Sequence, residues 1–451
     1  MNSVIPAGTD WLANFQEWLQ PFLAAFKRSE QRCWAPLYLQ GLLGAGTRKS
    51  VEPMAERVCP GQTQQLHHFV STSTWSTTPL EQVLRKTADA LVGGKDAVLI
   101  VDDTELPKQG KHSVGVKRQH CGVLGKQANC QVLVSLTLAR KEVPVPIALR
   151  LYLPEDWAQD EARRAAAKVP ESVTFEPKGD IALAQIDAAL ADDVRFGIVL
   201  ADAGYGSSAE FRAGLTQRGL RWAVGVQPTQ KVYPADVTLD MPANPPVGRP
   251  AKYAKPSVPS VSVVQMIDTL GPKALRRCSW RYGTKGMLSA RFAAVRVCVA
   301  DGVLASHWQH LPGQAAWLVC EARSSGERKY YFTNHPPNTP RRTLDRAIKA
   351  RWACEQAHQQ LKDELGLDHY EGRSWLGLHH HALLTMMAFT YLQHRRLASN
   401  LQAGEKTSSQ CAGSAASAII AGNTPRHSRR ATPCHLPSVS SMQRHNTSNS
   451  T

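Results

Sequence analysis

The sequence lacks several features that would place the chain in a membrane, outside the cell or in a disulfide-bonded scaffold. It contains no run of about 18 apolar residues, so we expect no membrane-spanning helix. Its first residues show no charged stretch followed by an apolar one, so we expect no signal peptide. Its ten cysteines include no Cys-x-x-Cys pair and are scattered along 451 residues. This distribution predicts reduced thiols in a cytoplasmic protein.

Acidic residues are scarce relative to basic ones. The chain has 37 Asp and Glu residues against 53 Lys and Arg residues, which gives a formal net charge of +16. Such an excess favours polyanionic partners, chiefly nucleic acid, although a basic protein need not bind one. Hydrophobic residues make up 43% of the chain, which is enough to bury a real core. The length predicts about two to four domains.

Changes in residue pattern divide the chain into five segments. Residues 1–92 show apolar residues at helical spacing and predict a helical module with basic faces. Residues 93–227 alternate Val- and Leu-rich runs with Ala-rich helical patterns, which predicts a mixed α/β sheet. Residues 228–325 are proline-rich and then β-like, and predict a β-rich insertion. Residues 326–398 predict a last core strand and two long helices, and residues 399–451 predict a disordered tail.

Aspartates stand at the ends of two predicted strands. Asp102 and Asp103 end the apolar run AVLIVDD, and Asp202 ends RFGIVLAD before Gly204 and Gly206, which allow a tight turn. Carboxylates at the ends of neighbouring strands converge on one edge of a sheet, and hard oxygen ligands suit Mg²⁺ or Mn²⁺. For any one of these aspartates alone, a role in capping a helix or closing a turn is the commoner explanation.

A glutamate lies between two basic residues on a predicted helix. Arg351, Glu355 and Lys362 are four and then seven residues apart, so they share one helical face. Cations in this position could neutralise phosphate charge, but a surface ion-pair stripe explains the spacing equally well. Further basic residues after the first aspartate could track a DNA backbone or form a solvated loop: Lys108, Lys111, Lys117, Arg118 and Lys126.

Together these segments resemble insertion-sequence transposases of the DDE (Asp-Asp-Glu) superfamily. The most specific blocks are VDDTELPKQGKHSVGV (101–116), QHCGVLGKQANCQVLVSLTLA (119–139), VLADAGYG (199–206) and ELGLDHYEGRSWLGLHHHALL (364–384). The resemblance covers about residues 25–398. It implies an α/β fold with a ribonuclease H-like mixed-sheet catalytic core, a β-rich insertion and an N-terminal helical domain that binds DNA.

The resemblance also implies a role for each acidic residue. Asp102 matches the first acid, Asp202 the second and Glu355 the third. Asp103 could be the ligand in place of Asp102, since only one of two consecutive strand residues faces the site. Related families commonly have Asp, any residue, Thr at this point, and Thr104 puts Asp102 in that register.

Related families carry a tyrosine-arginine-glutamate-lysine signature on the helix of the third acid. Its last three members fit Arg351, Glu355 and Lys362, whereas its tyrosine position falls on Ile348. The contact that a tyrosine would make is therefore missing. The residues that the resemblance implies for binding DNA phosphates are Arg351, Lys362, Lys108, Lys111 and Arg118.

The implied activity is cleavage of transposon ends and their joining to target DNA by two-metal-ion hydrolysis and transesterification. Two Mg²⁺ ions, which Mn²⁺ can replace, are expected per active site. Double-stranded DNA, both ends and target, is the expected partner, with a dimer in the DNA complex, at the bacterial nucleoid in the cytoplasm. Two alternatives remain: a ribonuclease H-like nuclease without strand transfer, and a transposase remnant that binds DNA without cutting it.

Histidines and tryptophans invite other assignments. His379, His380 and His381 with His369 could suggest zinc, but consecutive helical residues point about 100° apart, so we expect packing or phosphate contact instead. Trp280, Trp308 and Trp317 fall in the predicted insertion. In related transposases an aromatic residue there can stack on a flipped base, although packing in a core is the commoner role of such a residue.

Overall fold

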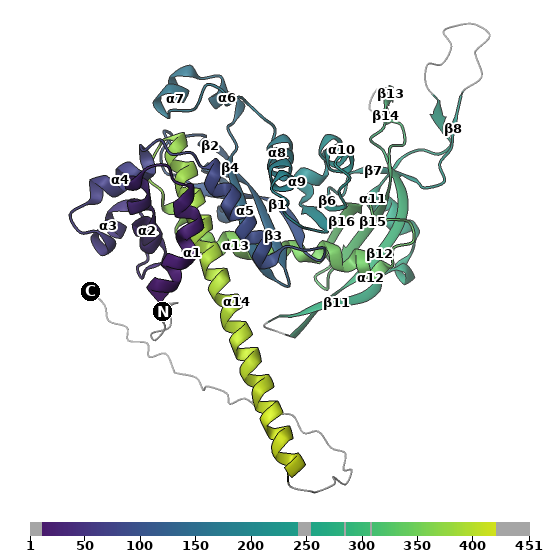
Figure 1. The fold of residues 1–451 in the computed structure, drawn as a ribbon. Helices are drawn as coiled ribbons and strands as arrows, with labels where there is room; N and C mark the ends of the chain where they lie inside the picture. Colours follow the sequence, from purple (N-terminus) through teal and green to yellow (C-terminus); the bar gives the residue numbers. More distant parts are fainter. Residues whose placement is uncertain (1–10, 242–253, 284–285, 307–308, 421–451) are drawn as a thin grey trace, which may run out of the picture. The chain divides into compact units, whose positions relative to one another are not determined.

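The computed structural model describes residues 11–241, 254–283, 286–306 and 309–420 (Figure 1). The described residues up to Arg396 belong to one compact unit, and the described residues from Leu397 onward are assigned to another. Among the described residues, none of the helices combines the length and apolar character that a bilayer crossing requires. Trp308 lies outside the described residues.

The segment predicted to be a disordered tail, 399–451, differs from that expectation in its first part. Helix α14 (Trp375–Ile420) continues through residues 399–420. This stretch is rich in alanine and contains no proline, so its backbone can remain helical even though its apolar residues show no periodicity. Residues 421–451 lie outside the described residues.

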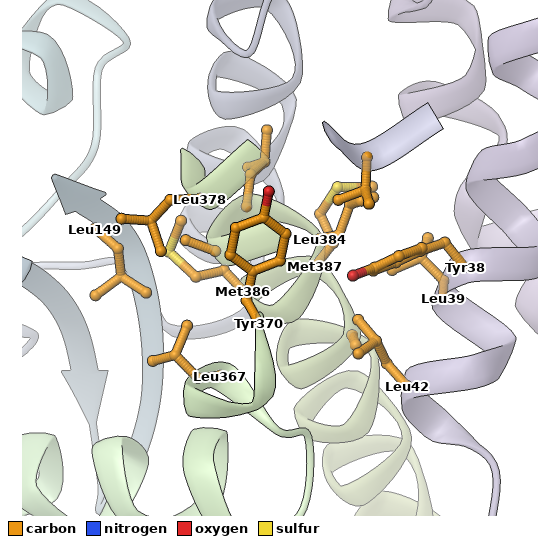
Figure 2. Packing of buried hydrophobic residues seen from close by; sticks show 14 of the residues in the cluster. Tyr38, Leu39, Leu42, Leu149, Leu367, Tyr370, Leu378, Leu384, Met386 and Met387 are labelled. Carbon is orange, nitrogen blue, oxygen red and sulfur yellow. The ribbon is translucent and has the colours of Figure 1, made fainter. Parts of the chain in front are cut away.

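From residue 11 onward, where the described part of the chain begins, five helices precede the first strand, and their apolar faces meet α14 in one core. Tyr38 and Leu39 of the second helix, Leu149 of a strand and Met387 of α14 belong to this core, and Figure 2 shows their side chains together. Most of its members are almost fully shielded from solvent. The five helices are α1 (Trp11–Ala25), α2 (Ser29–Leu43), α3 (Val51–Val58), α4 (Thr63–Ser71) and α5 (Thr78–Val92).

The strands of the α/β segment form one side of a 12-stranded mixed sheet. The first long strand pairs antiparallel with β3, which in turn pairs antiparallel with β4 and β2. On its other side the first strand pairs in parallel with β5, and β5 pairs in parallel with β6. The mixed α/β sheet predicted from the sequence is confirmed, with strands β1 (Val98–Pro107), β2 (Lys117–Cys121), β3 (Lys126–Arg140), β4 (Val143–Leu151), β5 (Ile198–Ala201) and β6 (Trp222–Val226).

Helices connect the fourth strand to the fifth and the fifth strand to the sixth. Gln185 of α8 donates from Nε2 to the carbonyl of Val134 in β3 at 3.1 Å, so α8 lies against the sheet. Asp202 and Ser208 cap the next two helices with their side chains. The helices are α6 (Glu155–Ala158), α7 (Glu161–Ala166), α8 (Lys178–Ala191), α9 (Ala203–Gly206) and α10 (Ala209–Gln217).

The segment predicted to be a separate β-rich insertion extends the same sheet. Its long strands pair with one another and then with β16, which pairs antiparallel with β6. The open edge of β6 explains this arrangement, because its unpaired backbone groups need partners. The strands are β7 (Lys231–Pro234), β8 (Leu239–Asp240), β9 (Lys255–Pro256), β10 (Val261–Ser262), β11 (Arg276–Gly283), β12 (Gly286–Val299), β13 (Leu304–Ser306), β14 (Gln309–His310), β15 (Ala315–Ala322) and β16 (Arg328–Thr333), with helix α11 (Val263–Thr269).

The long helix predicted after the last strand is broken in the structure. It consists of α12 (Arg341–Ala347), a 3₁₀ turn (Ile348–Arg351) and α13 (Trp352–Asp363). A 3₁₀ turn has fewer residues per turn than an α-helix, so it brings Ile348 and Cys354 closer to one side. Both are buried in a core with strand residues of the sheet. The periodic pattern predicted the helical segments but not this change of pitch.

Candidate active site

Asp102 and Asp202 lie beside each other because of the register of two parallel strands. Val101 of β1 pairs with Ala201 of β5, and the next residue of each strand is an aspartate. Neighbouring strands are about 4.8 Å apart, so the two aspartates stand side by side where β5 ends. The charge of Asp202 contributes to a raised pKa of Asp102.

Backbone groups fix the orientation of both carboxylates. Asp202 caps α9, and its Oδ1 accepts hydrogen bonds from the backbone N–H of Gly204 at 2.9 Å and of Tyr205 at 3.2 Å. Oδ1 of Asp102 accepts one from the backbone N–H of Asp103 at 3.0 Å. The capping role that explains a lone aspartate is therefore present at Asp202, in addition to its place beside Asp102.

Alternation along β1 separates Asp102 from Asp103. Ile100 packs in the core formed with α12 and α13, and Asp102, two residues later, faces the same side. Oδ2 of Asp102 accepts a hydrogen bond from Nη1 of Arg351 at 2.5 Å. Asp103 instead pairs with Lys178 Nζ of α8 at 2.6 Å and accepts a hydrogen bond from the hydroxyl of Tyr205. The two aspartates thus have different partners on opposite faces of the sheet.

Arg351 joins the first and third acids of the predicted set. It ends the 3₁₀ turn, and its guanidinium donates through Nη1 to Asp102 and through Nη2 to Oε1 of Glu355. Glu355 stands in the first turn of α13, where the helix dipole favours a negative charge, and its side chain is 60% exposed. The side chain of Asp102 is only 13% exposed. One carboxylate is therefore nearly enclosed while the other can move.

The surroundings of Asp102 oppose its negative charge. Burial raises the pKa of Asp102 to about 7, and nearby Asp202 adds to this rise, whereas the Arg351 guanidinium lowers it. The single arginine therefore does not fully compensate the charge of the carboxylate pair. A further cation near Asp102 and Asp202 would stabilise their ionised forms.

Three donor side chains lie close together in the part of the chain that the structure describes. The ligand atoms of Asp102, Cys354 and His358 are all within 4.8 Å of one another. Asp102, Asp202 and Glu355 do not meet that limit as a set. Neither Cys354 nor His358 was among the site residues expected from the sequence, although their four-residue spacing on a helix places them on one face.

Two members of the helical signature lie away from the acids. Ile348, at the tyrosine position, is buried in the core beside α13. Lys362 lies near Glu105 and Asp368, whose charges partly offset the burial that lowers the pKa of its ammonium group. The structure therefore brings together Arg351 and Glu355 but does not show Lys362 in contact with them.

The basic residues after the first acid have different environments. Nζ of Lys108 donates to the carbonyl of Tyr370 at 2.7 Å and to that of Asp368 at 3.4 Å, so this side chain fastens one loop to another. Lys111 and Arg118 are exposed. Lys111 and Arg118 could contact a ligand that approaches from solvent, whereas the ammonium group of Lys108 is already hydrogen-bonded within the protein.

A cavity of about 450 Å³ opens beside Arg351 and Glu355. Trp280 and Tyr331 line it, so Trp280 of the predicted insertion does reach the neighbourhood of the acids. Its ring also packs on Phe292 and lies 4.5 Å from Nζ of Lys349. Trp317 donates from Nε1 to the carbonyl of Pro336. Further polar and aromatic residues line the cavity, among them Glu321, Lys349 and Trp352.

The consecutive histidines of α14 each bond to a different part of the molecule. His379 contacts backbone atoms of Leu151 and Trp375, His380 contacts the carbonyls of Val70 and Trp75, and His381 contacts the hydroxyl of Tyr38 and the carbonyl of Gly366. These directions fit the packing role that we expected. The group of three donors described above contains none of these histidines.

Comparisons with known proteins agree with the sequence blocks. The family described as DDE superfamily endonuclease matches residues 21–287, which include Asp102 and Asp202 but end before Glu355. A probable transposase for insertion sequence element IS701, from Microchaete diplosiphon, is 29% identical over 181 residues, which are 40% of this chain and 45% of that protein. The chain thus spans less than half the length of this relative.

A solved structure has a partly similar arrangement. It is a piggyBac transposase in a synaptic complex with hairpin DNA, at 8% identity and a TM-score of 0.39, covering 86% of this chain and 72% of that one. The family match extends over more than half of the 451 residues and confirms the family predicted from the sequence. The chain belongs to the DDE superfamily of endonucleases.

Proposed function

We propose that the chain is a DNA transposase, which cleaves the ends of a mobile element and joins them to target DNA. The observation that carries this proposal is the β1–β5 register, which sets Asp102 beside Asp202, with Glu355 linked to Asp102 through Arg351. The relative described as a probable insertion-sequence transposase supports transposon ends as the substrate. The proposed partners are double-stranded DNA and, in the DNA complex, a second copy of the chain, acting at the bacterial nucleoid.

The fold supports a ribonuclease H-like core within the larger sheet. Three antiparallel strands, β1, β3 and β4, precede two strands, β5 and β6, that run parallel to β1. The first two acids stand on β1 and directly after β5. In this proposal residues 1–92 are the DNA-binding helical module, and the strands of 228–325 are an insertion that extends the sheet of the core.

The donor set fits hard divalent cations. Asp102 and Asp202 present carboxylates side by side, Glu355 is largely exposed and linked to Asp102 through Arg351, and the raised pKa of Asp102 marks a charge that Arg351 does not fully compensate. When bound, two Mg²⁺ ions would activate the attacking oxygen and stabilise the leaving oxygen of the phosphodiester, and Mn²⁺ could replace them. The residues that would hold them are Asp102, Asp202 and Glu355, with Asp103 on the opposite face serving to position β1.

The chain's own residues have distinct tasks in this mechanism. Backbone N–H groups hold Asp102 and Asp202 in fixed orientations before DNA binds, which lowers the cost of organising the site. Arg351 is within reach of a phosphate placed between Asp102 and Glu355 and would neutralise its charge. Exposed Lys111 and Arg118 would contact the DNA backbone. Lys108 and Lys362 would contribute positive potential rather than direct contacts.

Substitution of each acid tests the assignment. The substrates are duplexes that carry the DNA flanking the reading frame. On them, Asp102→Asn, Asp202→Asn and Glu355→Gln should each lower Mg²⁺-dependent cleavage by about 10³-fold or more. Each substitution removes a carboxylate that would hold the metal ions beside the reacting phosphate. Asp103→Asn is the matched control and should keep cleavage within about tenfold of wild type. Equal losses in Asp102→Asn and Asp103→Asn, or normal cleavage in Asp202→Asn, would refute the assignment.

Strand joining is tested separately from cleavage. Pre-cut ends with a free 3′-hydroxyl are incubated with a circular target, and joined products are separated by size. The proposal expects joining that requires the same three acids. Cleavage without any joining would instead identify a ribonuclease H-like nuclease.

A further inference from the structure

Cys354 and His358 form a buried pair of donors directly beneath the first acid. They lie four residues apart on α13, so both face the same side of the helix, toward β1 and β3. The thiol of Cys354 is completely enclosed, and His358 is 7% exposed. Asp102 closes the group from the strand, and its side chain connects the group to the surface of the site.

The distances within this group suit a tetrahedral metal ion. Sγ of Cys354 and Nε2 of His358 are 3.4 Å apart. Two ligands at about 2.0–2.3 Å from a tetrahedral ion stand about 3.5 Å from each other, so this pair needs little movement. The third ligand atom, from Asp102, is within 4.8 Å of both. A shift of about 1 Å by the Asp102 carboxylate would complete the three-sided site.

The thiol of Cys354 and the imidazole of His358 favour a different class of metal ion from the one that the three carboxylates favour. Thiolate and imidazole ligands favour Zn²⁺, Cd²⁺ and Co²⁺, whereas Mg²⁺ prefers oxygen ligands. Ser135 lies beside two of the donors, since its hydroxyl is 2.8 Å from Nε2 of His358 and donates to the backbone carbonyl of Asp102 at 2.9 Å; a metal ion bound to Nε2 would replace the first of these contacts. Thr137 places its hydroxyl 3.4 Å from the Cys354 thiol. These hydroxyls position both donors beside Asp102.

We propose that Asp102, Cys354 and His358 form a binding site for a soft divalent ion such as Zn²⁺ or Cd²⁺, which withdraws Asp102 from the set of three acids and so inhibits the enzyme. Binding forms a metal–sulfur bond and releases the thiol proton of Cys354 to solvent, with no change in oxidation state. The inhibitory part rests on the proposed function, whereas the binding part does not.

The two uses of Asp102 exclude each other on geometric grounds. Oδ2 of Asp102 faces Arg351 on the open side of the site, and Cys354 and His358 lie on the enclosed side. A carboxylate that turns toward the enclosed side loses its contact with Arg351 and its alignment with Asp202. Soft ions at low concentration should therefore oppose the activation by Mg²⁺ instead of replacing it.

Direct binding is measured with Co²⁺ as the probe. Co²⁺ added to the full-length, chelator-treated protein should produce a near-ultraviolet thiolate-to-cobalt charge-transfer band, and excess Zn²⁺ should abolish it. Cys354→Ser, which keeps a hydroxyl near Thr137, and His358→Gln should each weaken Co²⁺ binding at least about tenfold. Cys59→Ser removes another buried thiol, in the N-terminal helices, and should leave the band unchanged. A band that is absent, or that persists in Cys354→Ser, would overturn the proposal.

Inhibition is measured on the cleavage reaction at fixed Mg²⁺. Zn²⁺ should inhibit the wild-type protein at concentrations at least about tenfold below those needed for Cys354→Ser. Equal sensitivity of the two proteins would contradict the inhibitory role. If the wild-type protein cleaves no DNA, the proposed function is refuted. The Co²⁺ band would still decide whether Asp102, Cys354 and His358 form a metal site. If Cys354→Ser does not fold, as judged by circular dichroism, His358→Gln provides the same comparison.

Discussion

At the scale of single residues, Arg351 determines how the proposed acids are arranged. Its guanidinium donates to Asp102 at 2.5 Å and also to Glu355, and it is the cation that most opposes the raised pKa of Asp102. A planar guanidinium can bind two carboxylates at once, which a lysine ammonium does less specifically. Arg351 therefore sets both the position and the charge of the site.

Arg351→Lys should lower Mg²⁺-dependent cleavage by about 10²-fold, because the substitution keeps the charge but loses the fork that aligns Asp102 with Glu355. DNA affinity, measured by fluorescence anisotropy, should change much less than the cleavage rate. Arg195→Lys is the control, since Arg195 forms an exposed pair with Asp89. Cleavage by Arg351→Lys at the wild-type rate would show that the two contacts are incidental.

Asp345 predicts a pH dependence of stability. It is 1% exposed in α12, and burial raises its pKa to about 6, although Arg341 opposes this shift. The folded protein therefore holds this proton more tightly than the unfolded chain, so stability is lost as pH rises from about 4 to about 6. Asp345→Asn should match wild type at pH 4 and be more stable at pH 8 by about 1–3 kcal/mol, the upper value being what two pKa units correspond to.

Urea titrations at the two pH values measure this difference. Asp187→Asn is the control with the opposite sign, because hydrogen bonds from Arg218 lower the pKa of Asp187. That variant should gain no stability at pH 8. A stabilising effect of Asp345→Asn that is the same at pH 4 and pH 8 would rule out the ionisation as its cause.

Residue patterns predicted that the two strand-ending aspartates would converge but not how their neighbours would be arranged. Two predicted strands that end in aspartates were visible in the sequence, and Asp102 and Asp202 do lie side by side. The choice between Asp102 and Asp103 depends on which face of β1 meets α13, and a run that is apolar on both faces does not encode this. Cys354 was overlooked because its partners, Asp102 and Ser135, are distant in sequence.

At the scale of elements, sequence patterns predicted the individual helices and strands better than they predicted the turns and strand pairings that join them. The 3.6-residue periodicity identified the helices around Glu355, but the 3₁₀ turn at Ile348–Arg351 arises from packing against the sheet. The β-like runs after residue 228 predicted strands, but hydrogen bonding between strands distant in sequence decided that they extend the main sheet. Local pattern does not determine such pairing.

Helix α14 and the N-terminal helices are joined through His380. Its ring stacks on Trp75 at 3.5 Å and contacts the carbonyls of Val70 and Trp75 at 3.0 and 2.9 Å. His380→Ala should lower the free energy of unfolding by about 2–4 kcal/mol, because it leaves a cavity and unpaired carbonyls. His68→Ala, on the exposed side of α4, should change it by no more than about 0.5 kcal/mol. Equal effects in urea titrations would contradict this role.

At the scale of the whole unit Met1–Arg396, the N-terminal helices share their core with the sheet. Phe15 and Phe22 of α1 belong to the same buried cluster as Leu149 of β4, Leu361 of α13 and Phe389 of α14. The helical module predicted for residues 1–92 therefore lacks a core of its own in the structure. Binding of DNA by these helices would be communicated to α13, which carries Glu355, through direct packing.

Deletion of residues 1–92 should prevent cooperative folding of the remainder, because it exposes the apolar faces of α13 and α14. Near-ultraviolet circular dichroism and a thermal melt of the purified fragment measure this, and we expect loss of tertiary signal with helical content retained. A variant ending at Arg396 is the control and should melt as the full chain does, since the shared core ends before that residue. A sharp melting transition in the N-terminal deletion would show that the catalytic segment folds alone.

The doublet Asp102–Asp103 leaves β1 little tolerance for errors in alignment. A displacement by one residue would bring Asp103 to the place of Asp102, next to Asp202, and would keep a carboxylate at that edge. The same displacement would put Asp102 in the place of Val101, which is fully buried, and would break the pairing of Asp103 with Lys178. Burial of an unpaired carboxylate is costly, so the two adjacent acids themselves oppose a shifted strand.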